Sequence, residues 1–193
     1  MKIRQHGRYQ YSPIGSRPSY DWPDRKKLAF YIALNIEHFS FGEGLGHTPT
    51  NPGRQPDVRN FAWRDYGLRV GIWRIFDLLD ELDLPACHLM NSSIYDYAPE
   101  IPERIRQRGD EFVGHGRTNS EQQSDYGEDD ERTLIDEVVS IFKKHEGNGP
   151  DGWMGPWISE SDVTPDLLKE AGCRYIMDWP CDDQPIWMKT RSG

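Results

Sequence analysis

The sequence predicts an α/β fold built on a mostly parallel sheet, either open or closed into a barrel. Three observations support this prediction. Short apolar runs of strand length recur along the chain, amphipathic helical segments separate them, and Gly or Pro residues mark the junctions. Strands that alternate with helices pair in parallel, because each helix returns the chain to the starting edge of the sheet. The 193 residues suit one domain of ordinary size.

The first apolar run, Leu28–Ile36, is nearly continuous and is typical of a strand buried on both faces. A long Gly- and Pro-rich stretch, residues 37–64, follows it, and loops of that length are usually functional or disordered. Four further strands are predicted at Pro85–Asn91, Glu111–Gly114, Gly152–Trp157 and Tyr175–Trp179.

Helices are expected between these strands. The first is Tyr66–Leu82, for which Asp65 is the candidate N-cap, and a short helix, Pro99–Arg108, ends at Gly109. A helix over about Glu128–His145 opens with four acidic residues and closes with three basic ones, which complements the helix dipole. For the last helix, Thr164 is the predicted cap, Pro165 the first residue and Gly172 the exit.

The first 27 residues read as an extended arm, because three prolines interrupt any regular structure there. Residues 28–193 form the predicted domain. The arm holds seven basic and two acidic residues, so its net charge is +5. The whole chain has a net charge of −9, so the remaining residues carry −14. A basic arm on an acidic body suggests that it lies on its own or a neighbouring subunit, which would make a homo-oligomer. A loose, solvated tail is the alternative.

Composition also limits the partners and the location. A net charge of −9 disfavours nucleic acid or an acidic membrane as the main partner. No apolar run approaches the roughly 20 residues of a membrane span, and the first residues lack the apolar stretch of a signal peptide. Three cysteines without a CxxC spacing fit a reducing, cytoplasmic location.

In parallel α/β folds ligands bind beyond the carboxyl ends of the strands, so the residues that follow each predicted strand are the candidate site. Glu37 and His38 follow the first strand. A carboxylate there could act as general base, or it could be a loop carboxylate without a catalytic role. Neighbouring side chains of a regular strand face opposite sides, so both can reach one pocket only if the strand has already broken.

His115 stands between two glycines after the third strand, four residues before Asn119. Two His at that spacing can hold Zn²⁺, whereas Asn suits harder cations, and Glu121 is the other candidate for a third ligand. The alternative is that His115 hydrogen-bonds the protein and binds no metal. Among residues near the later strand ends, Trp157, Trp179 and the pair Asp182-Asp183 could contact a substrate, or be core and turn residues.

These strand-end residues resemble the polysaccharide deacetylase (NodB homology) superfamily, and most closely its branch of allantoinases and cyclic imide hydrolases. The similarity runs from about Trp22 to the end of the chain. Its most specific stretches are LNIEHFSFGEG, FAWRDYG, NSSIYDY, FVGHGRTNSEQQ, GWMGPWISES, VTPDLLKEAGCRY and MDWPCDDQPIW. The resemblance implies an irregular (β/α) barrel and hydrolysis of an amide-type carbon–nitrogen bond.

The family pattern also implies roles for particular residues. Glu37 and His38 stand where deacetylases carry two adjacent Asp, a base and a metal ligand, and His115 and Asn119 stand where they carry two His. Gly155 replaces an Arg that supports the base. A fifth motif, with a His that acts as general acid, would lie beyond Gly193, so we expect a barrel that is incomplete at its C-terminal end.

We therefore expect a hydrolase for a small amide, cyclic amide or imide, or alternatively an N-acetyl sugar deacetylase or an inactive ligand-binding relative. Glu37 and Asp183 are the expected catalytic residues. The expected metal is one divalent ion, zinc foremost, and catalysis without a metal stays open. The expected metal ligands are His38, His115 and Asn119, and the expected substrate contacts are Trp157, Trp179, Asp182 and Glu121.

Overall fold

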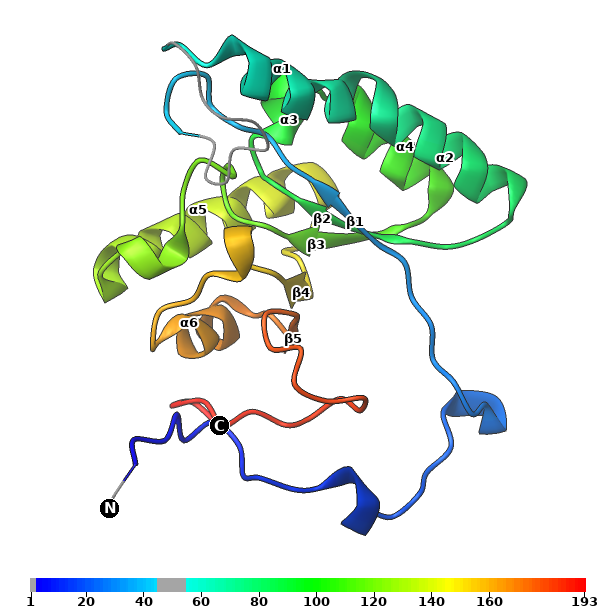
Figure 1. Ribbon diagram of the computed structural model, residues 1–193, viewed down its shortest axis with the longest axis vertical. Coiled ribbons are helices and arrows are strands. Elements are labelled where there is room, and N and C mark those ends of the chain that lie inside the picture. The colour runs from blue at the N-terminus through cyan, green and yellow to red at the C-terminus, as the bar shows by residue number, and fades with distance from the viewer. Residues whose placement is uncertain (1–2, 45–54) are drawn as a thin grey trace.

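The computed structural model describes residues 3–44 and 55–193, and a five-stranded parallel sheet lies at its centre (Figure 1). The strands are β1 (Ala33–Ile36), β2 (Cys87–Met90), β3 (Glu111–Gly114), β4 (Gly152–Trp153) and β5 (Tyr175–Ile176). Each pairs in parallel with the next along the chain, from Ala33 opposite Cys87 to Trp153 opposite Ile176. The parallel sheet is confirmed, and its sequential strand order is that of a (β/α) barrel wall.

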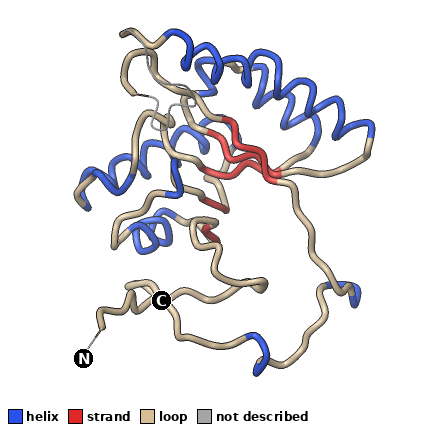
Figure 2. Tube along the Cα trace, in the orientation of Figure 1, coloured by secondary structure: helices blue, strands red, loops and turns tan. Residues whose placement is uncertain are grey.

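Helices separate the strands, as the alternating pattern predicts (Figure 2). They are α1 (Val58–Tyr66), continued by a π-helical turn (Gly67–Gly71) into α2 (Ile72–Glu81), then α3 (Ile94–Tyr97), α4 (Glu100–Arg108), α5 (Glu128–Glu146) and α6 (Thr164–Ala171). Figure 1 shows α2 and α4 beside β1 and β2, and α5 and α6 on the side of β4 and β5. The core between helices and sheet contains the fully buried Phe76, Met90, Phe142 and Trp153.

The prediction of a long first strand is wrong at its start. β1 begins only at Ala33, and Leu28, Phe30 and Tyr31 are 77%, 79% and 69% exposed. β2 begins at Cys87, whose N–H also binds the carbonyl of Ile32, so residues before Ile32 have no described strand beside them. β4 and β5 are likewise shorter than predicted, at two residues each.

Two predicted helix starts also differ from the structure. The first helix begins at Val58, where the Asp57 side chain accepts a hydrogen bond from Asn60 N at 3.2 Å, so Asp65 lies inside the helical segment rather than capping it. The rest of the predicted 37–64 loop includes residues 45–54, which lie outside the described residues. Thr164 is the first residue of α6 rather than its cap, because its hydroxyl binds Glu131 instead. The stops at Gly109 and Gly172 are confirmed, and both glycines are left-handed.

The N-terminal arm lies along the C-terminal segment of its own chain (Figure 1). Arg8 makes a two-point ion pair with Asp166 of α6, at 2.7 and 2.8 Å, and its carbonyl accepts a hydrogen bond from Lys189 N. Arg17 binds both oxygens of Asp182, at 2.7 and 2.6 Å. These contacts give the basic arm an acidic partner within the chain, as one of the alternatives predicted.

Candidate active site

Glu37 and His115 meet at the carboxyl ends of β1 and β3. Oε1 of Glu37 lies 3.7 Å from Nε2 of His115 and accepts a hydrogen bond from Asn35 Nδ2 at 3.1 Å. Burial of Glu37 acts to raise the pKa of its carboxyl, but the interactions with His115, Asn35 and Arg64 outweigh burial and lower it. Glu37 is therefore an ionised carboxylate at neutral pH, the form that a general base needs.

The His115 ring is fixed by its other nitrogen. Nδ1 lies 2.5 Å from the carbonyl oxygen of Met154, which only accepts, so Nδ1 carries a proton. Nε2 is buried without a hydrogen-bond partner among the described residues and is aimed at Glu37. The imidazole nitrogen and the carboxylate oxygen thus face each other just beyond hydrogen-bond distance.

Each of the two glycines beside His115 is required by a different close contact. A Cβ on Gly114 would stand 2.5 Å from Cε3 of Trp153, so β3 can approach the tryptophan only without a side chain there. Gly116 has a φ of +68°, and a Cβ there would stand 2.7 Å from Cγ of Pro156. The turn GHG is thus closely packed against the β4 loop, which holds His115 at 1% exposure.

Asn91 ties three strand ends together from the end of β2. Its Oδ1 accepts a hydrogen bond from His38 N at 2.7 Å, and its Nδ2 donates to Asn119 Oδ1 at 2.9 Å and to the carbonyl of His115. Asn119 N in turn donates to the carbonyl of His38 at 2.8 Å. This buried amide network fixes the loops after β1 and β3 relative to one another.

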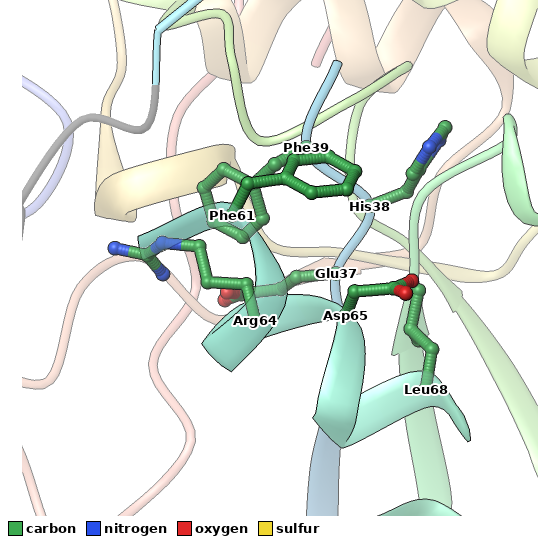
Figure 3. A pocket seen from close by; sticks show the side chains of 7 residues that line it. All are labelled: Glu37, His38, Phe39, Phe61, Arg64, Asp65 and Leu68. Atoms are coloured by element: carbon green, nitrogen blue, oxygen red, sulfur yellow. The ribbon is translucent and has the colours of Figure 1, made fainter. Parts of the chain in front are cut away.

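His38 turns away from Glu37, as the alternation of a strand predicts (Figure 3). Its Nδ1 lies 2.9 Å from Ser93 Oγ, and its ring stacks on Tyr97 with centroids 4.2 Å apart. Burial lowers the pKa of His38, and Asp65 only partly offsets this, so the ring is neutral at pH 7.

The three predicted metal ligands have hydrogen-bond partners within the protein. His38 faces Ser93, and the Asn119 oxygen already accepts from Asn91. Within residues 3–44 and 55–193, no three His, Cys, Asp or Glu side chains gather as a metal site would require. A divalent metal agrees with the family in general terms, whereas zinc and the ligand roles of His38, His115 and Asn119 stay predictions.

A cavity beside Glu37 is lined by α1 and the loop after β1 (Figure 3). Arg64 lies there with its guanidinium carbon 4.1 Å from the centre of the Phe39 ring and 5.6 Å from the Trp157 ring. Trp157 has a φ of +65° and donates from Nε1 to the carbonyl of Asn119 at 2.9 Å. Trp157 therefore contacts Arg64 and Phe39, which line the cavity, and its substrate contact stays a prediction.

The remaining predicted substrate and catalytic residues have partners elsewhere. Glu121 binds Arg117 at 2.7 Å and accepts from Tyr126 at 2.9 Å. Trp179 donates to Glu160, Asp182 binds Arg17 of the arm, and Asp183 is exposed. The structure therefore groups Glu37, His115, Asn119 and Trp157, and it does not bring Asp182 or Glu121 to them. The substrate role of these residues, and the catalytic role of Asp183, stay predictions.

Two carboxyl groups, those of Asp178 and Glu160, lie near the loop that carries Trp157. Asp178 accepts the N–H of Gly155 at 2.8 Å, and Glu160 accepts from Trp179 at 2.8 Å. Burial and the charge of Glu160 raise the pKa of Asp178 to about 8. The two carboxyls thus share protons near neutral pH, and Asp178 in either state holds the start of the Trp157 loop.

Sequence reasoning missed Arg64 and Asn91 as site residues. Arg64 stands four residues before the buried Leu68 and so lies on the inner face of the helix. A charged residue on that face was the signal that could have indicated a site residue. Asn91 ends the predicted second strand, so its position was a signal, but its role could not be predicted because its three partners lie 24–53 residues away in sequence.

Comparison with known proteins finds relatives in one family of hydrolases. A family model described as polysaccharide deacetylase matches residues 64–176. A peptidoglycan deacetylase of Helicobacter pylori is 27% identical over 106 residues, which are 55% of this chain and 36% of that protein. This chain therefore spans about a third of the length of that curated relative.

Solved structures extend the similarity to most of the chain. An allantoinase matches with a TM-score of 0.71 and 25% identity, over 90% of this chain and 61% of its own. A polysaccharide deacetylase from Mycobacterium smegmatis matches with a TM-score of 0.66 and 25% identity, over 82% of this chain and 55% of its own. Both have (β/α) barrel folds, in line with the predicted fold class. No helix among the described residues is long and apolar enough to cross a membrane. The family model covers more than half of the chain, and the protein belongs to the polysaccharide deacetylase family.

Proposed function

We propose that this chain hydrolyses a non-peptide amide bond in a small amide or cyclic amide, with Glu37 as general base and His115 as its proton partner. The observation that carries the proposal is the 3.7 Å approach of His115 Nε2 to Glu37 Oε1. The similarity to an allantoinase over 90% of this chain supports a small substrate.

The reaction can be followed atom by atom. Glu37 takes a proton from water as the water oxygen bonds to the amide carbon, which gives a tetrahedral oxyanion. In this scheme His115 starts with protons on both ring nitrogens and Glu37 starts ionised. His115 donates its Nε2 proton to the amide nitrogen, the carbon–nitrogen bond breaks, and a carboxylic acid and an amine are released. The proton on Glu37 then passes to His115 across the short gap, which restores the starting state.

One relative favours a second candidate, deacetylation of an N-acetyl sugar, since the Helicobacter pylori protein is a peptidoglycan deacetylase. The bond type and the proton steps would be the same, and only the pocket contacts would differ. Assembly into a homo-oligomer through the arm, and a cytoplasmic location, likewise remain proposals.

A substrate screen tests the function. Purified protein would be offered allantoin, cyclic imides and acetylated chito-oligosaccharides, with product followed by mass spectrometry before and after treatment with a chelator. Turnover of any of them should fall by a factor of about 10² or more in Glu37→Gln, the range for loss of a general base. Glu146→Gln, a matched change at a carboxylate held by Arg106, is the control. Equal turnover by wild type and Glu37→Gln would reject the proposal.

A further inference from the structure

The loop after β4, residues 155–160, contains two residues in the left-handed backbone region. Trp157 has a φ of +65° and Ile158 a φ of +52°, and a β-branched side chain is rarely found there. Such backbone persists only where the surrounding structure fixes it. The Trp157 ring contacts Phe39 and Arg64, which line the cavity described above. The groups that fix the loop therefore also fix these contacts.

Asp178, which follows β5, contacts both ends of this loop. Its Oδ1 accepts a hydrogen bond from Gly155 N at 2.8 Å, at the start of the loop. Its carboxyl is also within hydrogen-bond reach of the carboxyl of Glu160, at the end of the loop. The two ends lie close together, because a Cβ on Gly155 would stand 2.5 Å from the carbonyl oxygen of Ser159. One side chain that is only 8% exposed thus joins both ends.

The contact between the two carboxyls needs a proton. Asp178 Oδ2 and Glu160 Oε1 are buried, and neither has a hydrogen-bond donor within residues 3–44 and 55–193. Oε2 of Glu160 already accepts from Trp179 Nε1 at 2.8 Å. An ionised carboxylate only accepts hydrogen bonds, so the two groups can bind each other only while one of them carries a proton. Without that proton, two buried negative charges face each other and repel.

The charged groups around the pair keep this proton in place at neutral pH. Burial and the charge of Glu160 raise the pKa of Asp178 to about 8, and burial also raises the pKa of Glu160. The buried Glu131 of α5 adds to the rise at Glu160. Arg8 of the arm opposes it, but Arg8 is already paired with Asp166. The proton is therefore lost only in mildly alkaline solution.

Three further groups that can gain or lose a proton gather around Trp179. The rings of His6 and Tyr9 pack on its indole, with centroids 5.3 and 5.8 Å away, and Tyr9 hydrogen-bonds Cys181. Variants at His6 and Cys181 therefore serve as controls.

We propose that the proton shared by Asp178 and Glu160 is a pH-sensitive switch of loop 155–160. While the pair keeps the proton, it joins the end of the loop to its start and fixes the strained backbone. When both carboxyls are ionised, repulsion turns Glu160 away, and Asp178 holds only the start of the loop. The loop then relaxes, and the Trp157 ring leaves its fixed position beside the candidate site. The switch does not depend on which bond the site hydrolyses.

The test follows Trp157 and needs no turnover, so failure of the substrate screen would not affect it. Protein labelled with 5-fluorotryptophan has seven ¹⁹F signals, one for each Trp, and Trp157→Phe identifies the relevant one. In the wild type this signal should move in one transition centred near pH 8. Its solvent-isotope shift between H₂O and D₂O, which measures exposure of the fluorine to water, should grow across the same transition.

Amide variants distinguish the switch from a general effect of pH. In Asp178→Asn the amide can accept from Gly155 N and donate to Glu160, so the signal should stay at its low-pH position up to about pH 10. Glu160→Gln can accept from Trp179 and donate to Asp178, and it should abolish the transition too. Glu160→Ala, which releases the end of the loop, should give the high-pH signal at every pH.

His6→Gln and Cys181→Ser should both keep the wild-type transition. A transition that survives in Asp178→Asn, or a wild-type signal that does not move, would overturn the proposal. So would a shift without a change in the solvent-isotope effect, because the pair would then titrate without moving the loop. Thermal unfolding identifies a variant that does not fold. The two amide variants can keep both hydrogen bonds of the residue they replace, and they decide in that case.

Discussion

Nε2 of His115 lies 3.7 Å from Oε1 of Glu37, and no hydrogen bond from another described residue satisfies that nitrogen. Because the carbonyl of Met154 already fixes the proton on Nδ1, the site has one nitrogen that can gain or lose a proton next to one carboxylate. This is the geometry of an acid–base pair.

Replacing His115 by Asn should keep the fold and remove the proton partner. The Asn amide can still donate to the Met154 carbonyl in place of Nδ1, whereas Nε2 is lost. The rate should fall by about 10²- to 10⁴-fold, the usual range for an acid–base group. Since His115 helps to lower the pKa of Glu37, that pKa should rise, and the acid limb of the pH–rate profile should move to higher pH. An unmoved acid limb would contradict the pairing.

Gly114→Ala should destabilise the domain by about 1–3 kcal/mol or more, the usual cost of overpacking. The new methyl group would stand 2.5 Å from Trp153 Cε3, and that ring is itself fully buried. Urea unfolding would measure the loss. Gly127→Ala is the control, because nothing lies within 4 Å of a Cβ there, and it should cost far less. Similar losses of unfolding free energy at both positions would mean that the contact between Gly114 and Trp153 does not exclude a side chain there.

Asp178→Asn should make the protein more stable in alkaline solution. The pKa of Asp178 is raised from 3.8 to about 8. Between these two pH values the folded state therefore keeps a proton on Asp178 that the unfolded state has lost. Its contribution to stability is therefore present below about pH 4 and is lost as the pH rises through 8. An Asn can still accept from Gly155 N and carries no charge.

The measurement is the melting temperature of both proteins from pH 5 to pH 9. Above pH 8 the variant should melt at least about 2–4 °C higher, the shift that roughly 1 kcal/mol produces at this chain length. The difference should shrink as the pH falls. Glu160→Gln, which removes the neighbouring charge, should lower the pKa of Asp178 and reduce the same pH dependence. A constant difference at all pH values would refute the proton on Asp178.

Arg8→Met should loosen the N-terminal arm. Arg8 and Asp166 are 13% and 9% exposed as side chains, and breaking their two-point pair should cost about 1–3 kcal/mol, between the values for exposed and buried pairs. Limited proteolysis should then cut the arm faster. Arg4→Met is the control, since Arg4 and Asp162 form a pair of the same 2.7 Å length but are 85% and 87% exposed. Equal protection in both variants would mean that the Arg8 pair does not hold the arm.

The sequence by itself determined the alternation of strands and helices and the helix stops at Gly109 and Gly172, and it predicted Glu37 and His115 as candidate site residues. Each of these depends on local physics: apolar periodicity, the left-handed backbone that Gly allows, and the rule that parallel strands end at one edge. Leu28–Ile32 shows the limit of this reasoning. An apolar run became an exposed extended segment there, because strand formation needs a partner that the run itself cannot specify.

Only the tertiary structure decided how the site is used. The direction of the His38 ring depends on Ser93 and Tyr97, and the place of Asn119 depends on Asn91, so neither follows from a four-residue spacing. Arg64 lies near Glu37 because α1 begins earlier than predicted, and both residues line the groove along β1. Side-chain partners far apart in the chain set these orientations, and the energies that choose between them arise only once the strands have come together.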